Sequence, residues 1–97
     1  MKVVWSKRAG TDLDEIAQYI AQDKPLAAAN WVAELLSSTR RLADFPYSGQ
    51  QVPEKADPQY REIIVGTYRV IYRVTTQVEV LLVRRATRLL RQEELET

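Results

Sequence analysis

The sequence predicts a single α+β domain over residues 1–97, a two-layer sandwich with a helical hairpin on one face of an antiparallel sheet. Three observations support this fold. A β-branched stretch opens the chain, two stretches with helical apolar spacing fill residues 7–44, and three β-rich stretches follow between residues 60 and 85. Strands in hairpin succession after two helices give the order β-α-α-β-β-β and a mainly antiparallel sheet. A chain of this length supports one modest core.

The first strand is expected in the N-terminal stretch MKVVW, which is short and β-branched and would join the edge of the sheet. Apolar residues then recur at helical spacing, which predicts a helix over about residues 7–22. Ser6 is one candidate N-cap for this helix. The alternative is a capping box formed by Thr11 and Asp14.

The segment QDKP separates this helix from a second one. Asp23 is a candidate N-cap, and Pro25 suits the first turn of a helix because its missing N–H would have no partner there. The second helix is expected to run to about Asp44, before Pro46. So short a joint predicts an antiparallel hairpin of two amphipathic helices. The apolar stripe of the second helix holds Ala28, Val32, Leu35 and Leu42, with Trp31 beside it in the expected core.

Residues 45–58 contain three prolines and a glycine and are expected to form a surface loop. Three strands are predicted after it, at about residues 60–66, 68–75 and 78–85. The turns between them are Gly66-Thr67 and Thr75-Thr76-Gln77.

Strict alternation of side chains predicts which face each strand residue occupies. In the middle strand, Val70, Tyr72 and Val74 are expected to face the helices, which leaves Arg69 and Arg73 on the open face. In the last strand both alternating sets are apolar at the centre, which is typical of a central strand. In either register an arginine stands where that strand ends.

Arginine dominates the charge of the C-terminal part. Residues 60–92 contain seven arginines against Glu62 and Glu79, although the whole chain has a net charge of only +1. Guanidinium groups bind carboxylates and phosphates through a planar fork and also stack on aromatic rings. We therefore expect a target-binding surface there. The alternative is that the arginines pair with Glu62, Glu79 or the acidic tail of Glu93, Glu94 and Glu96, and such pairs contribute little when exposed. The candidate target-binding residues are Arg61, Arg69, Arg73, Arg84, Arg85 and Arg88.

Several kinds of site are excluded or disfavoured by composition. The chain has no cysteine and no histidine, which removes disulfides, thiolate metal sites and the commonest general base. We expect no metal and no cofactor: Asp12, Asp14 and Glu15 are interpreted as a solvated acidic turn of the first helix rather than a metal site. The N-terminal apolar run is only three residues long, so no membrane segment is expected and the default location is the cytoplasm.

An ordered set of short motifs resembles the ParE/RelE superfamily of toxins along nearly the whole chain. The matching pieces are Asp12-Leu13 with Ile16 and Tyr19-Ile20, Pro25 with Ala28 and Trp31, Leu42 with Phe45-Pro46 and Gly49, Pro53, Arg61-Glu62-Ile63, Tyr68 to Val74, and Val80 to Arg88. The resemblance implies the toxin of a type II toxin–antitoxin pair, held silent in a hetero-oligomer by a cognate antitoxin. We expect the antitoxin to cover a hydrophobic and cationic surface with an acidic or amphipathic tail.

The superfamily divides by target. RelE-like members are ribosome-dependent mRNA endoribonucleases, whereas ParE-like members inhibit DNA gyrase and are not known as nucleases. By resemblance, the RelE-like arginine corresponds to Arg69, and the later basic residue to Arg84, Arg85 or Arg88. Glu62 is the candidate base, although it suits a role as partner of Arg61 equally well.

Two parts of the RelE-like set are absent. No lysine occurs near residues 60–62, and no tyrosine follows Tyr72. Arginine is also a poor proton acceptor. The gyrase-binding, non-enzymatic interpretation is therefore favoured, with the endoribonuclease and a non-toxic antitoxin-binding relative as alternatives. Many ParE-like relatives carry a histidine where Arg85 stands, so a role tied to that histidine does not transfer.

Two further segments each have two alternative interpretations. Tyr47 lies in the proline-rich loop and either contacts a partner or packs within the loop. Leu89, Leu90 and Leu95 either form a short helix against the body or become ordered by the antitoxin.

Overall fold

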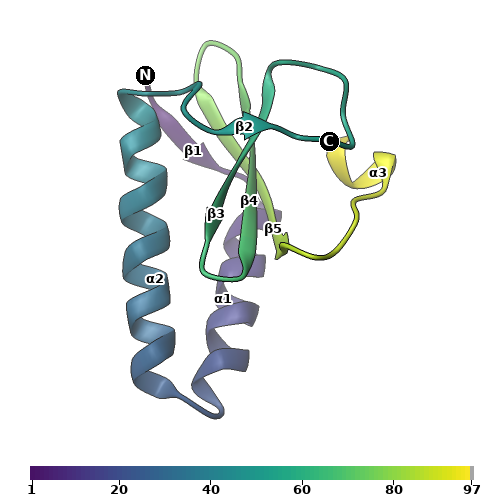
Figure 1. Ribbon diagram of the computed structural model, residues 1–97. Coiled ribbons are helices and arrows are strands. Elements are labelled where there is room, and N and C mark those ends of the chain that lie inside the picture. Colours follow the sequence, from purple (N-terminus) through teal and green to yellow (C-terminus); the bar gives the residue numbers. More distant parts are fainter. Residues whose placement is uncertain (97) are drawn as a thin grey trace.

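The computed structural model describes residues 1–96 and confirms the α+β architecture. A five-stranded sheet carries the helical hairpin on one face (Figure 1). The elements in chain order are β1 (Val3–Trp5), α1 (Lys7–Ala21), α2 (Pro25–Arg40), η1 (Arg41–Ala43), β2 (Gln50–Gln51), β3 (Tyr60–Val65), β4 (Tyr68–Val74), β5 (Val78–Arg85) and α3 (Gln92–Leu95).

Local sequence signals explain where the helices begin and end. Ser6 caps α1, since its hydroxyl accepts a hydrogen bond of 3.0 Å from the N–H of Ala9. The Thr11–Asp14 capping box is wrong, because both residues lie inside α1. Pro25 begins α2 as predicted, but the N-cap is Lys24 rather than Asp23 and makes no side-chain capping bond. The predicted second helix divides into α2 and the 3₁₀ turn η1.

The sheet has the strand order β1-β5-β4-β3-β2. The hairpins of β3, β4 and β5 are antiparallel, as is the pair of β2 with β3. β1 lies at the sheet edge as predicted, but it pairs in parallel with β5, so the sheet is mixed. This placement makes β5 a central strand. Parallel neighbours cannot be joined by a tight turn, and here the helical hairpin and strands β2 to β4 lie between β1 and β5 in the chain.

A β-bulge interrupts the alternation expected in β5. Ile71 lies opposite Leu82, whereas the next residue, Tyr72, lies opposite Val80, so Leu81 is the extra residue. The prediction of strict alternation is therefore wrong for this strand. As a result Val80 and Val83 both pack in the core beneath the helices.

The main core lies between the helical hairpin and the sheet. Trp31 and Leu35 from α2 pack there against Val70 and other strand residues. The indole N–H of Trp31 donates to the carbonyl of Val65 over 3.2 Å, which satisfies its one polar group. The prediction that Val70, Tyr72 and Val74 face inward is confirmed, since all three are buried against the helix-side core.

The second face of the sheet is not open. The loop of residues 52–59 and the C-terminal segment of residues 86–96 lie against it, and Figure 1 shows α3 beside that loop. Leu90 and Leu95 are buried there, whereas Leu89 is 81% exposed. The tail therefore forms a short helix that packs against the body. The residues of this smaller core are Val52, Tyr60, Ile71, Leu81, Leu82, Leu90 and Leu95.

Candidate functional site

The predicted cationic surface is mostly neutralised within the molecule. Arg69 on β4 and Arg84 on β5 are direct neighbours across the strands. Arg69 is only 4% exposed, so the expectation that it lies on an open face is wrong. Its Nε donates to Glu62 at 2.8 Å, and its Nη1 and Nη2 donate to the two oxygens of Glu54 at 2.8 Å each. Burying a guanidinium group requires such partners, because an unpaired buried charge is costly.

Glu54 is the carboxylate that joins this arginine to the tail. Its Oε2 also accepts a hydrogen bond of 2.9 Å from the backbone N–H of Leu90. The hydrogen bonds from the Arg69 side chain lower the pKa of Glu54 from 4.5 to about 2, although burial acts in the opposite direction. Glu54 therefore stays charged across the physiological pH range.

Arg84 occupies a second ionic cluster beside the first. Its Nη1 donates to Asp12 of α1 at 2.6 Å, and its Nε donates to Glu94 of α3 at 3.0 Å. Asp12 also accepts from the backbone N–H of Val83 at 3.0 Å, so it joins α1 to β5. The interpretation of Asp12 as part of a solvated turn is thus wrong. Among residues 1–96, no group of acidic side chains forms a metal site.

Glu94 binds more than one cation. It accepts from Arg88 at 3.3 Å and from the backbone N–H of Arg91 at 3.2 Å, in addition to Arg84. Burial alone would raise the pKa of Glu94, but these hydrogen bonds outweigh it and lower the pKa. At the other end of the face, Arg73 pairs with Glu79 at 3.0 Å. Four of the six candidate arginines therefore have carboxylate partners: Arg69, Arg73, Arg84 and Arg88.

Arg61 is one of the two candidates with no carboxylate partner within residues 1–96. It lies on the helix side of β3, opposite Tyr72, and its Nε donates to the carbonyl of Pro58 at 2.8 Å. The guanidinium stands 5.2 Å from the ring centroid of Tyr47, which is 53% exposed. Phe45 in the same loop is 64% exposed. We call Phe45, Tyr47 and Arg61 the Arg61 patch.

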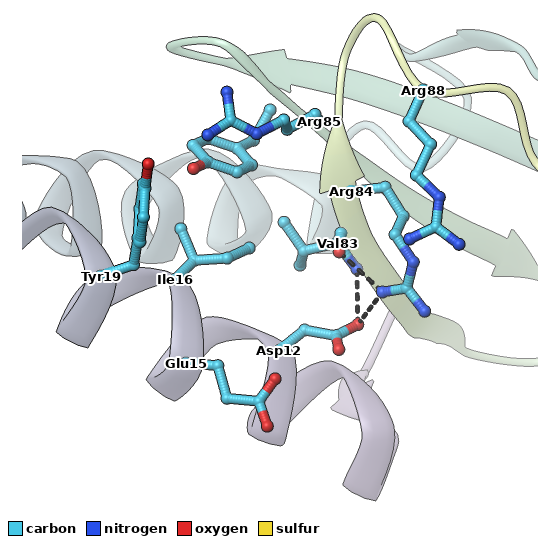
Figure 2. Close-up of a pocket in the computed structure, with 9 residues that line it drawn as sticks. Asp12, Glu15, Ile16, Tyr19, Val83, Arg84, Arg85 and Arg88 are labelled. Carbon is cyan, nitrogen blue, oxygen red and sulfur yellow. Dashed lines mark hydrogen bonds and ion pairs between the residues drawn. The ribbon is translucent and has the colours of Figure 1, made fainter.

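Arg85 is the other candidate arginine without a carboxylate partner in the described part of the chain. Its guanidinium lies 5.8 Å from the ring centroids of both Tyr19 and Tyr68. It borders a hollow of about 560 Å³ between α1 and the end of β5 (Figure 2). We call this the Arg85 hollow; its lining includes Glu15, Ile16, Tyr19, Val83 and Arg85.

The candidate nuclease residues are only partly brought together. Glu62 and Arg69 touch and Arg84 is adjacent, but Arg85 lies on the opposite face of the sheet. Glu62 is 5% exposed and also accepts from the amide of Gln50 at 3.1 Å. Glu62 is therefore a counter-ion of Arg69 in this structure, not of Arg61.

Sequence reasoning named the acidic tail, which includes Glu94, as an alternative partner of the arginines, but it missed Asp12 and Glu54. Asp12, Glu54 and Glu94 come from a helix, a loop and the tail, and no local spacing connects them with their partners. In residues 1–96, none of the helices combines the length and the apolar character needed to cross a membrane.

Comparison with known proteins identifies the family to which the chain belongs. Residues 3–90 match the family described as the ParE toxin of the type II toxin–antitoxin system parDE. A putative toxin, Y4kP, of Sinorhizobium fredii is 37% identical over 88% of both chains. In Caulobacter vibrioides, toxin RelE2 is 36% identical over 91% of this chain and 98% of its own length, and toxin ParE1 is 35% identical over 78% and 79%.

Solved structures agree at the level of the fold. A chain of the chromosomal ParDE system from P. aeruginosa superimposes with a TM-score of 0.73 at 21% identity, covering 88% of this chain and 95% of that one. A YoeB/ParE toxin from Agrobacterium tumefaciens gives a TM-score of 0.61 at 20% identity, covering 88% and 98%. The α+β sandwich is thus shared with these solved structures.

The protein belongs to the ParE toxin family, within the ParE/RelE superfamily. It is the toxin component of a type II toxin–antitoxin system, and its partner in such a system is an antitoxin.

Proposed function

We propose that this toxin inhibits DNA gyrase by binding to it, without making or breaking a covalent bond itself. The observation that carries the proposal is the burial of Arg69. This arginine matches the catalytic position of RelE-like ribonucleases, yet it is 4% exposed and held by two carboxylates. A phosphate clamp must reach its phosphate, and Arg69 has no free donor face for one.

The contacts of the candidate base also disfavour the proton transfers that a nuclease must carry out. Cleavage of RNA requires a base for the attacking 2′-hydroxyl and an acid for the leaving oxygen. Glu62 is the candidate base, but it is buried and bonded to Arg69 and Gln50. Arg84 is likewise engaged by Asp12 and Glu94. Binding to an enzyme, by contrast, needs only an exposed contact surface.

The Arg61 patch is the part of the predicted target-binding surface that best suits such a contact. Tyrosine and arginine are enriched among the residues that dominate binding energy at protein interfaces. Tyr47 and Phe45 are more than half exposed, and the Arg61 guanidinium is already stacked near Tyr47. The contact between Arg61 and Tyr47 therefore preorganises the patch. Arg61 also has no carboxylate partner within residues 1–96.

A supercoiling assay with purified gyrase tests the proposal. Increasing amounts of toxin should inhibit supercoiling and increase the amount of gyrase–DNA cleavage complex, and prior addition of the cognate antitoxin should prevent both effects. Absence of any effect at every ratio of toxin to gyrase would reject gyrase as the target. Expression without antitoxin should arrest growth; normal growth would instead indicate a non-toxic antitoxin-binding relative.

A ribosome-dependent mRNA endoribonuclease is the second candidate. The 36% identity to a toxin named RelE2 favours it, as does the direct cross-strand pairing of Arg69 with Arg84 beneath the tail. In that case Arg69 and either Arg84 or Arg85 would clamp the phosphate, with Glu62 as base. Mapping of mRNA 5′ ends on translating ribosomes distinguishes the two: codon-phased cleavage that Arg69→Ala abolishes would support the nuclease.

A further inference from the structure

The Arg85 hollow combines two charges that lack ion-pair partners within residues 1–96. Arg85 and Glu15 are both exposed, and neither takes part in a salt bridge of the described residues. Figure 2 shows them at opposite sides of the hollow, with Ile16 and Val83 between them. The site thus presents a cation, an apolar floor and an anion.

The position of Arg85 is fixed even though its charge is not neutralised. Its guanidinium stands beside the rings of Tyr19 and Tyr68, at 5.8 Å from each centroid. Stacking on aromatic rings stabilises the cation modestly and leaves the donors at the edge of the guanidinium plane free. Asp12, the other acidic side chain that lines the hollow, is already bound to Arg84.

The shape favours one kind of partner. The hollow runs between a helix and the end of a strand, and a single polypeptide segment fills such a concave site better than the flat surface of a folded enzyme. A segment with an acidic side chain, an apolar residue and a basic side chain would match Arg85, the Ile16–Val83 floor and Glu15 in turn. Opposite charges in register give specificity as well as affinity.

We propose that the Arg85 hollow is the docking site for one segment of the antitoxin, with an antitoxin carboxylate on Arg85 and an antitoxin cation on Glu15. The inference rests on the toxin–antitoxin assignment and does not depend on gyrase being the target. The proposed antitoxin site and the proposed gyrase-binding site are different surfaces, because the Arg61 patch and the Arg85 hollow lie at opposite ends of the helix-side face of the sheet. Antitoxin and target would therefore have distinct primary contacts.

Charge reversal tests this docking site. The affinity of the antitoxin encoded beside the toxin is measured by calorimetric titration for the wild-type toxin and for Arg85→Glu and Glu15→Lys. Both residues are exposed, so the variants should keep the wild-type thermal midpoint. Arg85→Glu should weaken binding about tenfold or more, and Glu15→Lys about three- to tenfold. Arg40→Glu and Glu34→Lys on α2, both exposed, are matched controls with less than about twofold effect.

Compensation tests direct contact. Antitoxin variants with single acidic residues changed to Arg are titrated against the Arg85→Glu toxin, and one of them should recover most of the lost affinity. Recovery by none, or wild-type affinity of Arg85→Glu, would overturn the proposal. So would loss of gyrase inhibition by Arg85→Glu with unchanged antitoxin affinity, because the hollow would then belong to the target. Failure of the wild-type toxin to inhibit gyrase would reject the proposed function alone, since the titrations are independent of it.

Discussion

The guanidinium of Arg69 and the carboxylate of Glu54 form a bidentate pair, with two N–O distances of 2.8 Å, that joins the start of β4 to the loop after β2. The same carboxylate accepts a hydrogen bond from Leu90, so the pair also holds the C-terminal tail. Arg69 further donates to the carbonyl of Arg88 at 3.1 Å. These bonds give the arginine of this strand a structural role, which leaves target binding to cations elsewhere.

Loss of the Glu54 charge should make the fold less stable and change its response to acid. Because the pKa of Glu54 is depressed from 4.5 to about 2, its contribution is present above pH 4.5 and is lost as the pH falls toward 2. We expect Glu54→Gln to lower the free energy of unfolding at pH 7 by about 1–2 kcal/mol. Urea denaturation between pH 7 and pH 2 measures it. An unchanged acid profile in the variant would contradict this role.

Removal of the Arg69 cation alone should lower the free energy of unfolding more than removal of both Arg69 and Glu62. Arg69→Met leaves Glu62, which is 5% exposed, without its cation, and should destabilise the protein by about 3–5 kcal/mol. In Arg69→Met/Glu62→Leu the more deeply buried charge is also gone while Glu54 still lacks its cation, so part of that loss should be recovered. Chemical denaturation of both variants measures the difference. A double variant less stable than the single one would show that Glu62 is not stabilised mainly by Arg69.

Gly49 should tolerate no side chain, whereas Gly10 should. A Cβ at Gly49 would lie 2.5 Å from the hydroxyl oxygen of Tyr72 and 2.6 Å from the carbonyl oxygen of Glu62. Gly49→Ala should therefore destabilise the fold by about 1–3 kcal/mol. Gly10 lies inside α1 with nothing within 4 Å of its added Cβ. Gly10→Ala should stabilise by about 0.5–1 kcal/mol. Thermal unfolding of the two variants checks both signs, and equal shifts would contradict the packing.

The tail should contribute to stability through Leu95 and not through Leu89. Leu95 is fully buried against the second face, whereas Leu89 is 81% exposed. We expect Leu95→Ala to cost about 2–4 kcal/mol and Leu89→Ala less than about 0.5 kcal/mol. Urea denaturation of the pair provides a matched comparison. Equal, small effects would mean that the tail does not pack on the sheet in solution.

The order of the two long helices and of β1, β3, β4 and β5 could be predicted because local periodicity reflects burial, but β2 lies within the predicted surface loop and was missed. Helical spacing marked α1 and α2, and Val70, Tyr72 and Val74 marked the inward face of β4. The bulge in β5 could not be predicted, since both alternating sets of that strand are apolar. The parallel pairing of β1 depends on the path of the whole helical hairpin and leaves no mark on the three residues of β1.

The candidate site was harder to predict because its contacts are long-range. Arg69 and Glu54 are 15 residues apart, and Arg84 and Asp12 are 72 apart. Strand alternation correctly placed Arg69 and Arg73 on the face away from the helices, but it gave no indication that a loop and the tail cover that face. The numerical excess of arginine over nearby acids was therefore a poor guide to which cations remain unpaired.

The most direct test of the account is the toxin concentration that half-inhibits gyrase supercoiling, measured for the wild type, Arg61→Ala and the exposed control Arg40→Ala. Truncation of a central interface arginine costs roughly 1.4 kcal/mol or more, which is about tenfold in affinity. We expect Arg61→Ala to require about ten times more toxin, while Arg40→Ala behaves as the wild type. Equal inhibition by all three proteins would contradict the assignment of the Arg61 patch, and no inhibition by the wild type would contradict gyrase as the target.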